Sequence, residues 1–164
     1  MIALLAGGLL TGNCGCTPPI KRTINITATD DVCKKSVEVH LVGVTRYERE
    51  GWAGMPMSEY WEPENERRTN AKEYTHVIRF GQEPCKRVFG KKEPMRKVWK
   101  GRSAEYLFVL ADLPGVFDDL PGNNDARRVE VPALDSKDWG WQSEIEIVIK
   151  SRAVEVRTVP KTKE

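Results

Sequence analysis

The chain has 164 residues, of which 40% are hydrophobic and 30% are charged, and its net charge at neutral pH is +2. This length accommodates one domain with a hydrophobic core and is too short for two comfortable ones. The composition is that of a soluble globular domain, and the small net charge gives no reason to expect nucleic acid as a partner.

The chain begins with a short apolar, glycine-rich run over residues 1–10, followed by Cys14, Cys16 and a Pro-Pro pair. This run is far shorter than the roughly 20 residues of a membrane-spanning helix, but it suits a signal segment of about 7–15 apolar residues. We expect residues 1–16 to be a lipoprotein signal and lipid-attachment segment, with Cys16 or Cys14 acylated, and residues 17–21 to be a stiff tether. A plain secretory signal and a buried first strand remain alternatives.

The rest of the chain has mostly the two-residue periodicity of strands. Apolar and β-branched residues alternate with polar ones, or form a continuous run, in seven segments: residues 24–28, 37–41, 74–80, 106–113, 129–131, 145–149 and 154–156. The continuous run at 106–113 is typical of a central strand covered on both faces. A hairpin-like break at 150–153 separates the last two segments. Turn-rich sequence separates most of the others.

These patterns predict an all-β fold, a two-sheet β-sandwich of about seven strands over residues 22–159, with a tail at 160–164. One insertion, residues 45–71, breaks the strand pattern because it is polar with scattered large apolar residues. Ser58 is a candidate cap for a short helix that begins near Glu59, so we expect one or two helical turns packed against the sandwich.

The insertion also carries three aromatic residues, Trp52, Tyr60 and Trp61. Aromatic side chains in a polar segment are frequent at recognition surfaces, which makes these three a possible partner surface. The alternatives are a staple that holds the insertion to the sandwich and a sugar-stacking surface. Two cysteines of the mature domain, Cys33 and Cys85, are a disulfide candidate if the protein is exported, and the closed loop would span about 50 residues.

No residues suggest catalysis, a metal site or a cofactor. The only histidines, His40 and His76, lie in predicted strands without the further ligands that zinc needs. Residues 118–125 are rich in oxygen donors, but the calcium-loop spacing is absent and a turn explains them. Without an activated nucleophile we expect no enzyme and no small-molecule substrate. Basic stretches at 86–100 and 150–163 are interpreted as a solvated loop and tail, with an anionic headgroup or an acidic partner as the alternative.

The order of these features resembles a known family. The segment Ala104-Glu-Tyr-Leu-Phe-Val-Leu-Ala111, the later Arg127-Arg128-Val-Glu-Val-Pro and the closing hairpin at 145–156 resemble strands of the outer-membrane lipoprotein of the type VI secretion membrane complex, the TssJ family. Residues 37–47, followed by the insertion at 52–61, resemble its strand and helix. The chain departs from the family in its short connection at 29–36 and in the basic segment 84–102.

The resemblance implies a structural lipoprotein anchored at the periplasmic face of the outer membrane. It also implies a docking partner, the periplasmic domain of an inner-membrane secretion protein. In the family the connection between the first two strands helps to make this contact, and here that connection is short. The alternative from the residues themselves is an envelope β-sandwich that binds glycan or peptidoglycan.

Overall fold

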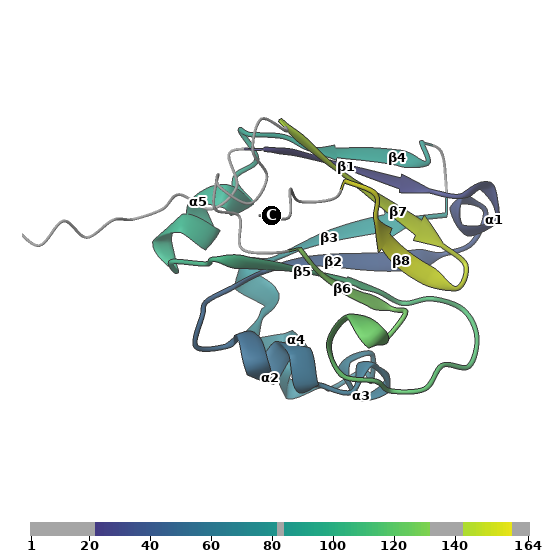
Figure 1. The fold of residues 1–164 in the computed structure, drawn as a ribbon, viewed down its shortest axis with the longest axis horizontal. Helices are drawn as coiled ribbons and strands as arrows, with labels where there is room; N and C mark the ends of the chain where they lie inside the picture. Colours follow the sequence, from purple (N-terminus) through teal and green to yellow (C-terminus); the bar gives the residue numbers. More distant parts are fainter. Residues whose placement is uncertain (1–21, 82–83, 132–142, 159–164) are drawn as a thin grey trace, which may run out of the picture.

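The structure is a computed structural model that describes residues 22–81, 84–131 and 143–158 (Figure 1). Within these residues, one four-stranded sheet contains β1 (Thr23–Ala28), β4 (Lys86–Phe89), β7 (Glu144–Lys150) and β8 (Ala153–Val156). The other contains β2 (Val37–Val44), β3 (Thr75–Phe80), β5 (Tyr106–Ala111) and β6 (Arg128–Val131). The two sheets pack face to face, which confirms the predicted β-sandwich.

The strand orders are β4-β1-β7-β8 and β3-β2-β5-β6. All neighbours are antiparallel except β1 and β7, which run parallel from the Thr23–Glu144 pair to the Ala28–Ile149 pair. The predicted closing hairpin forms, with β7 and β8 paired antiparallel up to Lys150 and Ala153.

The first sheet buries one face of its strands, whereas the central strands of the second sheet are buried on both faces. In β1 every second residue is buried, because only one face of the first sheet meets the core. In β2 and β5 almost every residue is buried. Figure 1 gives the reason, since the helices of the insertion cover the outer face of the second sheet. The continuous apolar run at 106–113 is therefore a strand covered on both faces, as predicted.

The insertion is more helical than the sequence predicts. It forms α2 (Arg49–Gly54), α3 (Met57–Tyr60) and α4 (Glu66–Asn70), followed by the 3₁₀ turn η1 (Lys72–Tyr74). The capping prediction for Ser58 is wrong, because Pro56 is the N-cap of α3 and Ser58 lies inside the helix. Its backbone N–H and hydroxyl instead bond to the carboxylate of Asp119 in the β5–β6 connection.

The basic segment that we expected to be a solvated loop forms β4 and α5 (Met95–Gly101). Strand β4 is short and has a single fully buried side chain, Phe89, so it lacks the alternation that marks the other strands. The indole of Trp99 in α5 stacks on Phe89 at 5.0 Å between ring centres and donates a hydrogen bond to the carbonyl of Tyr74 at 2.8 Å. These contacts make the segment part of the core.

Gly43 in β2 leaves the space that Trp99 fills. A Cβ atom at this position would lie 2.4 Å from Cδ1 of the indole, which is closer than non-bonded carbon atoms approach.

The connection between β1 and β2 contains the one-turn helix α1 (Asp30–Cys33), and η2 (Gly122–Asn124) precedes β6. Among the helices that the structure describes, none combines the length and the apolar character needed to cross a membrane.

Candidate functional site

Two of the three aromatic residues proposed for a partner surface are buried between the insertion, to which they belong, and the second sheet. Trp52 is 2% exposed and Tyr60 is 0% exposed, whereas Trp61 is partly exposed. The ring of Trp52 lies 6.4 Å from that of Phe108 on the outer face of β5. Trp52 and Tyr60 shield the apolar outer face of the second sheet from solvent. Only Trp61 of this set is left to meet a partner.

His40 connects the sheet to the insertion through two hydrogen bonds. Its Nδ1 atom lies 2.6 Å from the hydroxyl of Tyr60, and its Nε2 atom lies 2.7 Å from Oε1 of Glu38. Burial lowers the pKa of His40, although the carboxylate of Glu38 opposes this shift. A neutral imidazole fits both partners, since Nε2–H donates to the carboxylate and Nδ1 accepts from the hydroxyl. Burial also raises the pKa of Tyr60, so this hydroxyl keeps its proton.

A groove of about 640 Å³ lies beside this network, between the outer faces of β2 and β3 and the α3–α4 connection. Trp61 borders it, and Arg68 holds the connection by donating to the carbonyls of Trp61 and Pro63 at 3.4 and 3.0 Å. The full lining is Ser36, Glu38, His40, Trp61, Pro63, Arg68, Thr69, Lys72, Thr75, Val77, Arg79 and Asp112.

The groove presents charges of both signs. Arg79, whose side chain is 73% exposed, pairs with Glu38 at 2.8 Å. Burial and the carboxylate of Glu38 raise the pKa of Asp112, which follows β5 and lies beside Glu38, where its backbone N–H donates to the Glu38 carbonyl at 2.9 Å. A mixed polar lining with one aromatic ring suits a protein segment or a sugar better than an apolar ligand.

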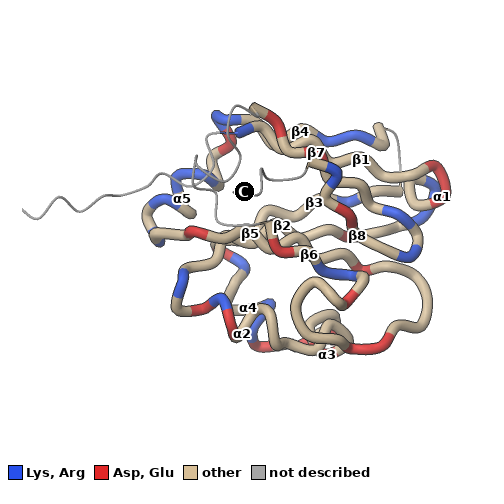
Figure 2. Tube along the Cα trace, in the orientation of Figure 1, with Lys and Arg blue, Asp and Glu red and all other residues tan. Residues whose placement is uncertain are grey.

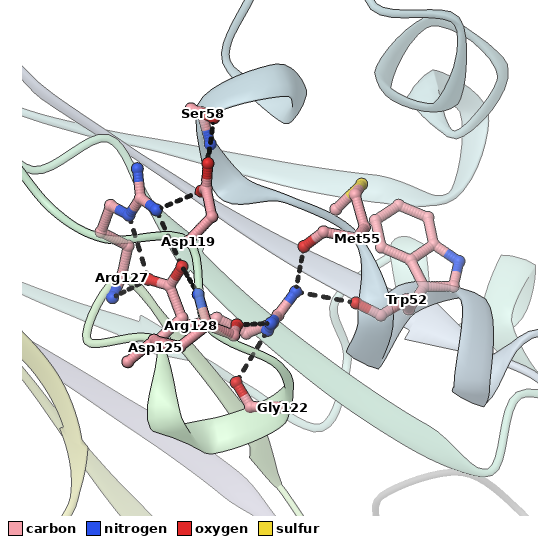
Figure 3. Close-up of polar contacts among 9 residues, drawn as sticks. Trp52, Met55, Ser58, Asp119, Gly122, Asp125, Arg127 and Arg128 are labelled. Carbon is pink, nitrogen blue, oxygen red and sulfur yellow. Dashed lines mark hydrogen bonds and ion pairs between the residues drawn. The ribbon is translucent and has the colours of Figure 1, made fainter.

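A buried arginine fixes the insertion to the start of β6. Arg128 is 1% exposed, and its guanidinium donates to the carbonyls of Trp52 and Met55 in the insertion at 3.0 and 2.7 Å (Figure 3). It also donates to the carbonyls of Leu120 and Gly122 at 2.7 and 3.0 Å. The side chain of Arg128 thus joins two segments that are about 70 residues apart in sequence and fixes their relative position.

The neighbouring arginine organises the acidic connection between β5 and β6. Arg127 pairs with Asp125 at 2.8 Å and with Asp119 at 2.6 Å (Figure 3). The hydrogen bonds from Ser58 and the charge of Arg127 lower the pKa of Asp119 to about 2. These carboxylates, which we weighed as calcium ligands, therefore neutralise an arginine. In the described part of the chain, no three His, Cys, Asp or Glu side chains are grouped to hold a metal ion.

The predicted disulfide is present between Cys33 in α1 and Cys85 just before β4, with the two Cα atoms 5.4 Å apart. It connects the end of the β1–β2 connection to the edge strand of the first sheet. The proposed lipid-attachment residues, Cys14 and Cys16, lie outside the described residues. So do the tether at residues 17–21 and the tail at residues 160–164.

Sequence reasoning missed the groove and the burial of Arg127 and Arg128. A charged pair at the start of a short strand looks like exposed surface in the sequence. Arg128 lies on the outer face of β6, opposite Leu110 and under the insertion, and Arg127 precedes the strand, so strand periodicity gives no signal of their burial.

No protein-family model matches the sequence, and no curated protein matches it. Solved structures match the fold. A structure of a type VI membrane complex is 11% identical over 82% of this chain and 95% of that chain, with a TM-score of 0.55. A structure of the C-terminal domain of the type VI secretion protein TssM from EAEC is also 11% identical, over 82% of this chain and 98% of that chain, with a TM-score of 0.54.

A third structure, Serratia marcescens Lip, a membrane-bound component of the type VI secretion system, is 14% identical over 88% of this chain and 99% of that chain, with a TM-score of 0.49. At such identities a likeness concerns the fold alone. The first two structures show that the chain shares its fold with chains of solved type VI secretion structures. The distant resemblance seen in the sequence is thereby confirmed as a resemblance of fold.

Proposed function

We propose that the protein is a lipid-anchored docking component of a type VI secretion membrane complex, located at the periplasmic face of the outer membrane. The observation that carries the proposal is the shared fold, which spans 95% of the matching chain from a type VI membrane complex. In this proposal residues 1–16 are the signal and lipid-attachment segment, 17–21 the tether, 22–159 the docking domain and 160–164 a tail. The role is structural, and no catalytic step is assigned.

A docking component must be rigid, because it holds its partner at a fixed position relative to the membrane. The four hydrogen bonds of Arg128 and the disulfide support this role, because they hold the insertion and the β1–β2 connection against the sandwich. A rigid contact surface loses little conformational entropy when a partner binds.

We infer that the groove beside Trp61 is the contact surface for the periplasmic domain of an inner-membrane secretion protein. Trp61 is the partly exposed member of the aromatic set, and the buried ring of Tyr60 packs edge-on against it, with 5.0 Å between the ring centres. The tilted packing of the indole on His40, at 4.8 Å between ring centres, keeps the ring in place. Aromatic anchors of this kind often contribute most of the affinity at protein interfaces.

The test is an affinity pull-down of the membrane-extracted protein, with mass spectrometry of the bound proteins. We expect recovery of a large inner-membrane protein that has a periplasmic domain, and the variant Trp61→Ala should reduce this recovery about tenfold or more. Tyr47→Ala is the matched control, because Tyr47 is 97% exposed on the β2–α2 connection, away from the groove. Equal recovery with both variants would place the contact elsewhere.

The lipid anchor has a separate test. Replacement of both Cys14 and Cys16 by Ser should release the protein from the membrane fraction, because acyl chains contribute about 0.8 kcal/mol per buried methylene. Continued attachment of the double variant to membranes that have been washed with high salt would overturn the anchor.

Binding of glycan or peptidoglycan is the second candidate. One observation favours it, namely that the ring of Trp61 lies in a groove with polar neighbours such as Glu38 and Arg68. The burial of Trp52 and Tyr60 counts against it, since a sugar platform needs several exposed rings. Calorimetric titration with soluble peptidoglycan fragments separates the two candidates. Binding that Trp61→Ala abolishes, together with an empty pull-down, would favour the glycan.

A further inference from the structure

The basic segment at residues 86–102 is unlike the rest of the molecule in charge. It contains eight of the chain's 26 Lys and Arg residues but only one of its 24 Asp and Glu residues. The remaining chain has 18 basic and 23 acidic residues, so the positive charge is concentrated here. Figure 2 shows blue segments along β4 and at α5. Five of these residues are exposed lysines, which we call the lysine patch: Lys86, Lys91, Lys92, Lys97 and Lys100.

The ammonium groups of the lysine patch are available to an outside partner. Among residues 22–81, 84–131 and 143–158, none of them forms an ion pair or a hydrogen bond with a side chain. Two of the three arginines of the segment are engaged within the fold. Arg96 donates to the carbonyl of Gly90 at 2.6 Å, and Arg102 pairs with Glu48 at 2.8 Å.

Two exposed apolar side chains lie among these lysines. Val88 is 54% exposed and Val98 is 38% exposed, and they belong to a set of six large apolar residues exposed in the described structure. Val88 lies two residues after Lys86 in the edge strand β4, so both side chains point to the outer face of the first sheet. Cationic and apolar side chains side by side are typical of surfaces that rest on a membrane interface.

Four lysines of the patch, Lys91, Lys92, Lys97 and Lys100, lie where the domain meets its tether, whereas Lys86 pairs with Thr27 toward the other end of β1. The guanidinium of Arg96 in α5 donates to the carbonyl of Arg22 at 2.6 Å, so α5 touches the chain just before β1 begins. From Cys16 to Arg22 the chain has six residues, which span at most about 20 Å when fully extended. An acyl chain at Cys16 or Cys14 would therefore keep α5 close to the lipid headgroups.

We propose that the lysine patch, with Val88 and Val98, is a membrane-contact surface that binds anionic phospholipid headgroups. The proposal rests on the proposed lipid anchor, which brings this end of the domain to the bilayer. Contact with headgroups fixes the orientation of the domain, so that the insertion and its groove, on the outer face of the other sheet, point away from the membrane (Figure 1). A tether alone would leave the domain free to rotate.

The experiment uses the full chain with Cys14→Ser and Cys16→Ser, so that no acyl chain contributes to binding. Co-sedimentation with vesicles of phosphatidylcholine and phosphatidylglycerol is compared with vesicles of phosphatidylcholine alone. We expect binding to the anionic vesicles only, and weaker binding as salt is added. Each lysine at the surface contributes about fivefold to the affinity, so Lys91→Gln, Lys97→Gln and Lys100→Gln together should reduce it about tenfold to a hundredfold.

The matched control is Lys34→Gln, Lys35→Gln and Arg152→Gln. It has the same net charge but changes exposed residues at α1 and at the β7–β8 turn, at the other end of the sandwich (Figure 1). Circular dichroism should report the same fold for both variants, because the changed side chains are exposed.

Three outcomes would overturn the proposal. The first is equal binding to both kinds of vesicle, and the second is an equal loss of affinity in both variants. The third is normal vesicle binding by the patch variant combined with loss of a bound protein in the pull-down, which would make the patch a protein contact. The vesicle assay needs no secretion partner and no acyl chain. Its failure would therefore leave the docking function standing, and failure of the pull-down would leave the patch standing.

Discussion

The replacement Arg128→Met tests whether one buried arginine holds the insertion in place. Methionine keeps most of the side-chain length but removes all four hydrogen bonds to the carbonyls of Trp52, Met55, Leu120 and Gly122. The bonds to Trp52 and Met55 are buried. A buried polar group left without a partner costs about 1–3 kcal/mol, so we expect a loss of about 2–6 kcal/mol in the free energy of unfolding.

This loss is a large share of the roughly 5–15 kcal/mol by which a domain is usually stable. Urea denaturation, followed by far-UV circular dichroism without reductant, measures it directly. The control is Arg49→Met, since Arg49 makes an exposed ion pair with Glu130 and should contribute no more than about 1 kcal/mol. Hydrogen exchange should also quicken in α2 and α3 of the Arg128 variant, because the insertion loses its main attachment.

The reasoning fails if Arg128→Met unfolds within about 1 kcal/mol of the wild type, at the level of the Arg49 control. In that case the aromatic packing of Trp52 and Tyr60 would hold the insertion without the arginine. An intermediate result is interpreted through exchange rates. Faster exchange confined to the insertion would confirm the local role of Arg128.

Three further changes have defined outcomes. Reduction of the Cys33–Cys85 disulfide, which closes a loop with a sequence separation of 52, should lower the free energy of unfolding by about 4 kcal/mol, measured by urea denaturation with and without reductant. Gly43→Ala should destabilise the protein by about 1–3 kcal/mol in thermal melting, because the new methyl group displaces the indole of Trp99. Asp119→Asn should remove part of the acid sensitivity: the pKa of this carboxyl is about 2 in the fold and higher in the unfolded chain, so its contribution is present above pH 4 and is lost as the pH falls from about 4 to 2.

Each of these three predictions has a control variant or measurement that tests the proposed physical reason. The double variant Cys33→Ala and Cys85→Ala should match the reduced protein, and a difference would mean that reduction acts elsewhere. Gly54→Ala places a methyl group where no atom lies within 4 Å, so a loss equal to that of Gly43→Ala would contradict the steric argument. For Asp119→Asn, a wild-type slope of stability against pH between 4 and 2 would count against the role of this carboxylate.

The alternation of apolar and polar residues determined the class of fold. In β1, Ile24, Ile26 and Ala28 are buried and the residues between them are not, as the sequence predicts. The continuous apolar run of β5 predicted burial on both faces, although the cover on its outer face was identified only in the structure. Local pattern suffices in these strands because each side chain's position follows from its neighbours two residues away.

The sequence also predicted the pairing of Cys33 with Cys85, because exported proteins with two cysteines in a small domain tend to join them. Strand β4 escaped prediction for the opposite reason. It buries one fully enclosed residue, Phe89, and exposes Lys86 and Val88, so it has no period to detect. Hydrogen-bonded pairing with β1 makes this segment a strand, although its own sequence has no strand periodicity.

Only the tertiary structure decided the roles of the polar and aromatic residues in the insertion and in β6. Trp52 and Trp61 look alike in the sequence, yet one covers the sheet and the other borders a groove. Arg128 looks like a surface residue in the sequence, yet its guanidinium makes four hydrogen bonds, two of which are buried. The physical reason is that a hydrophobic pattern encodes which side of an element is buried, whereas a hydrogen bond between residues 52 and 128 depends on where the whole fold brings two distant segments together.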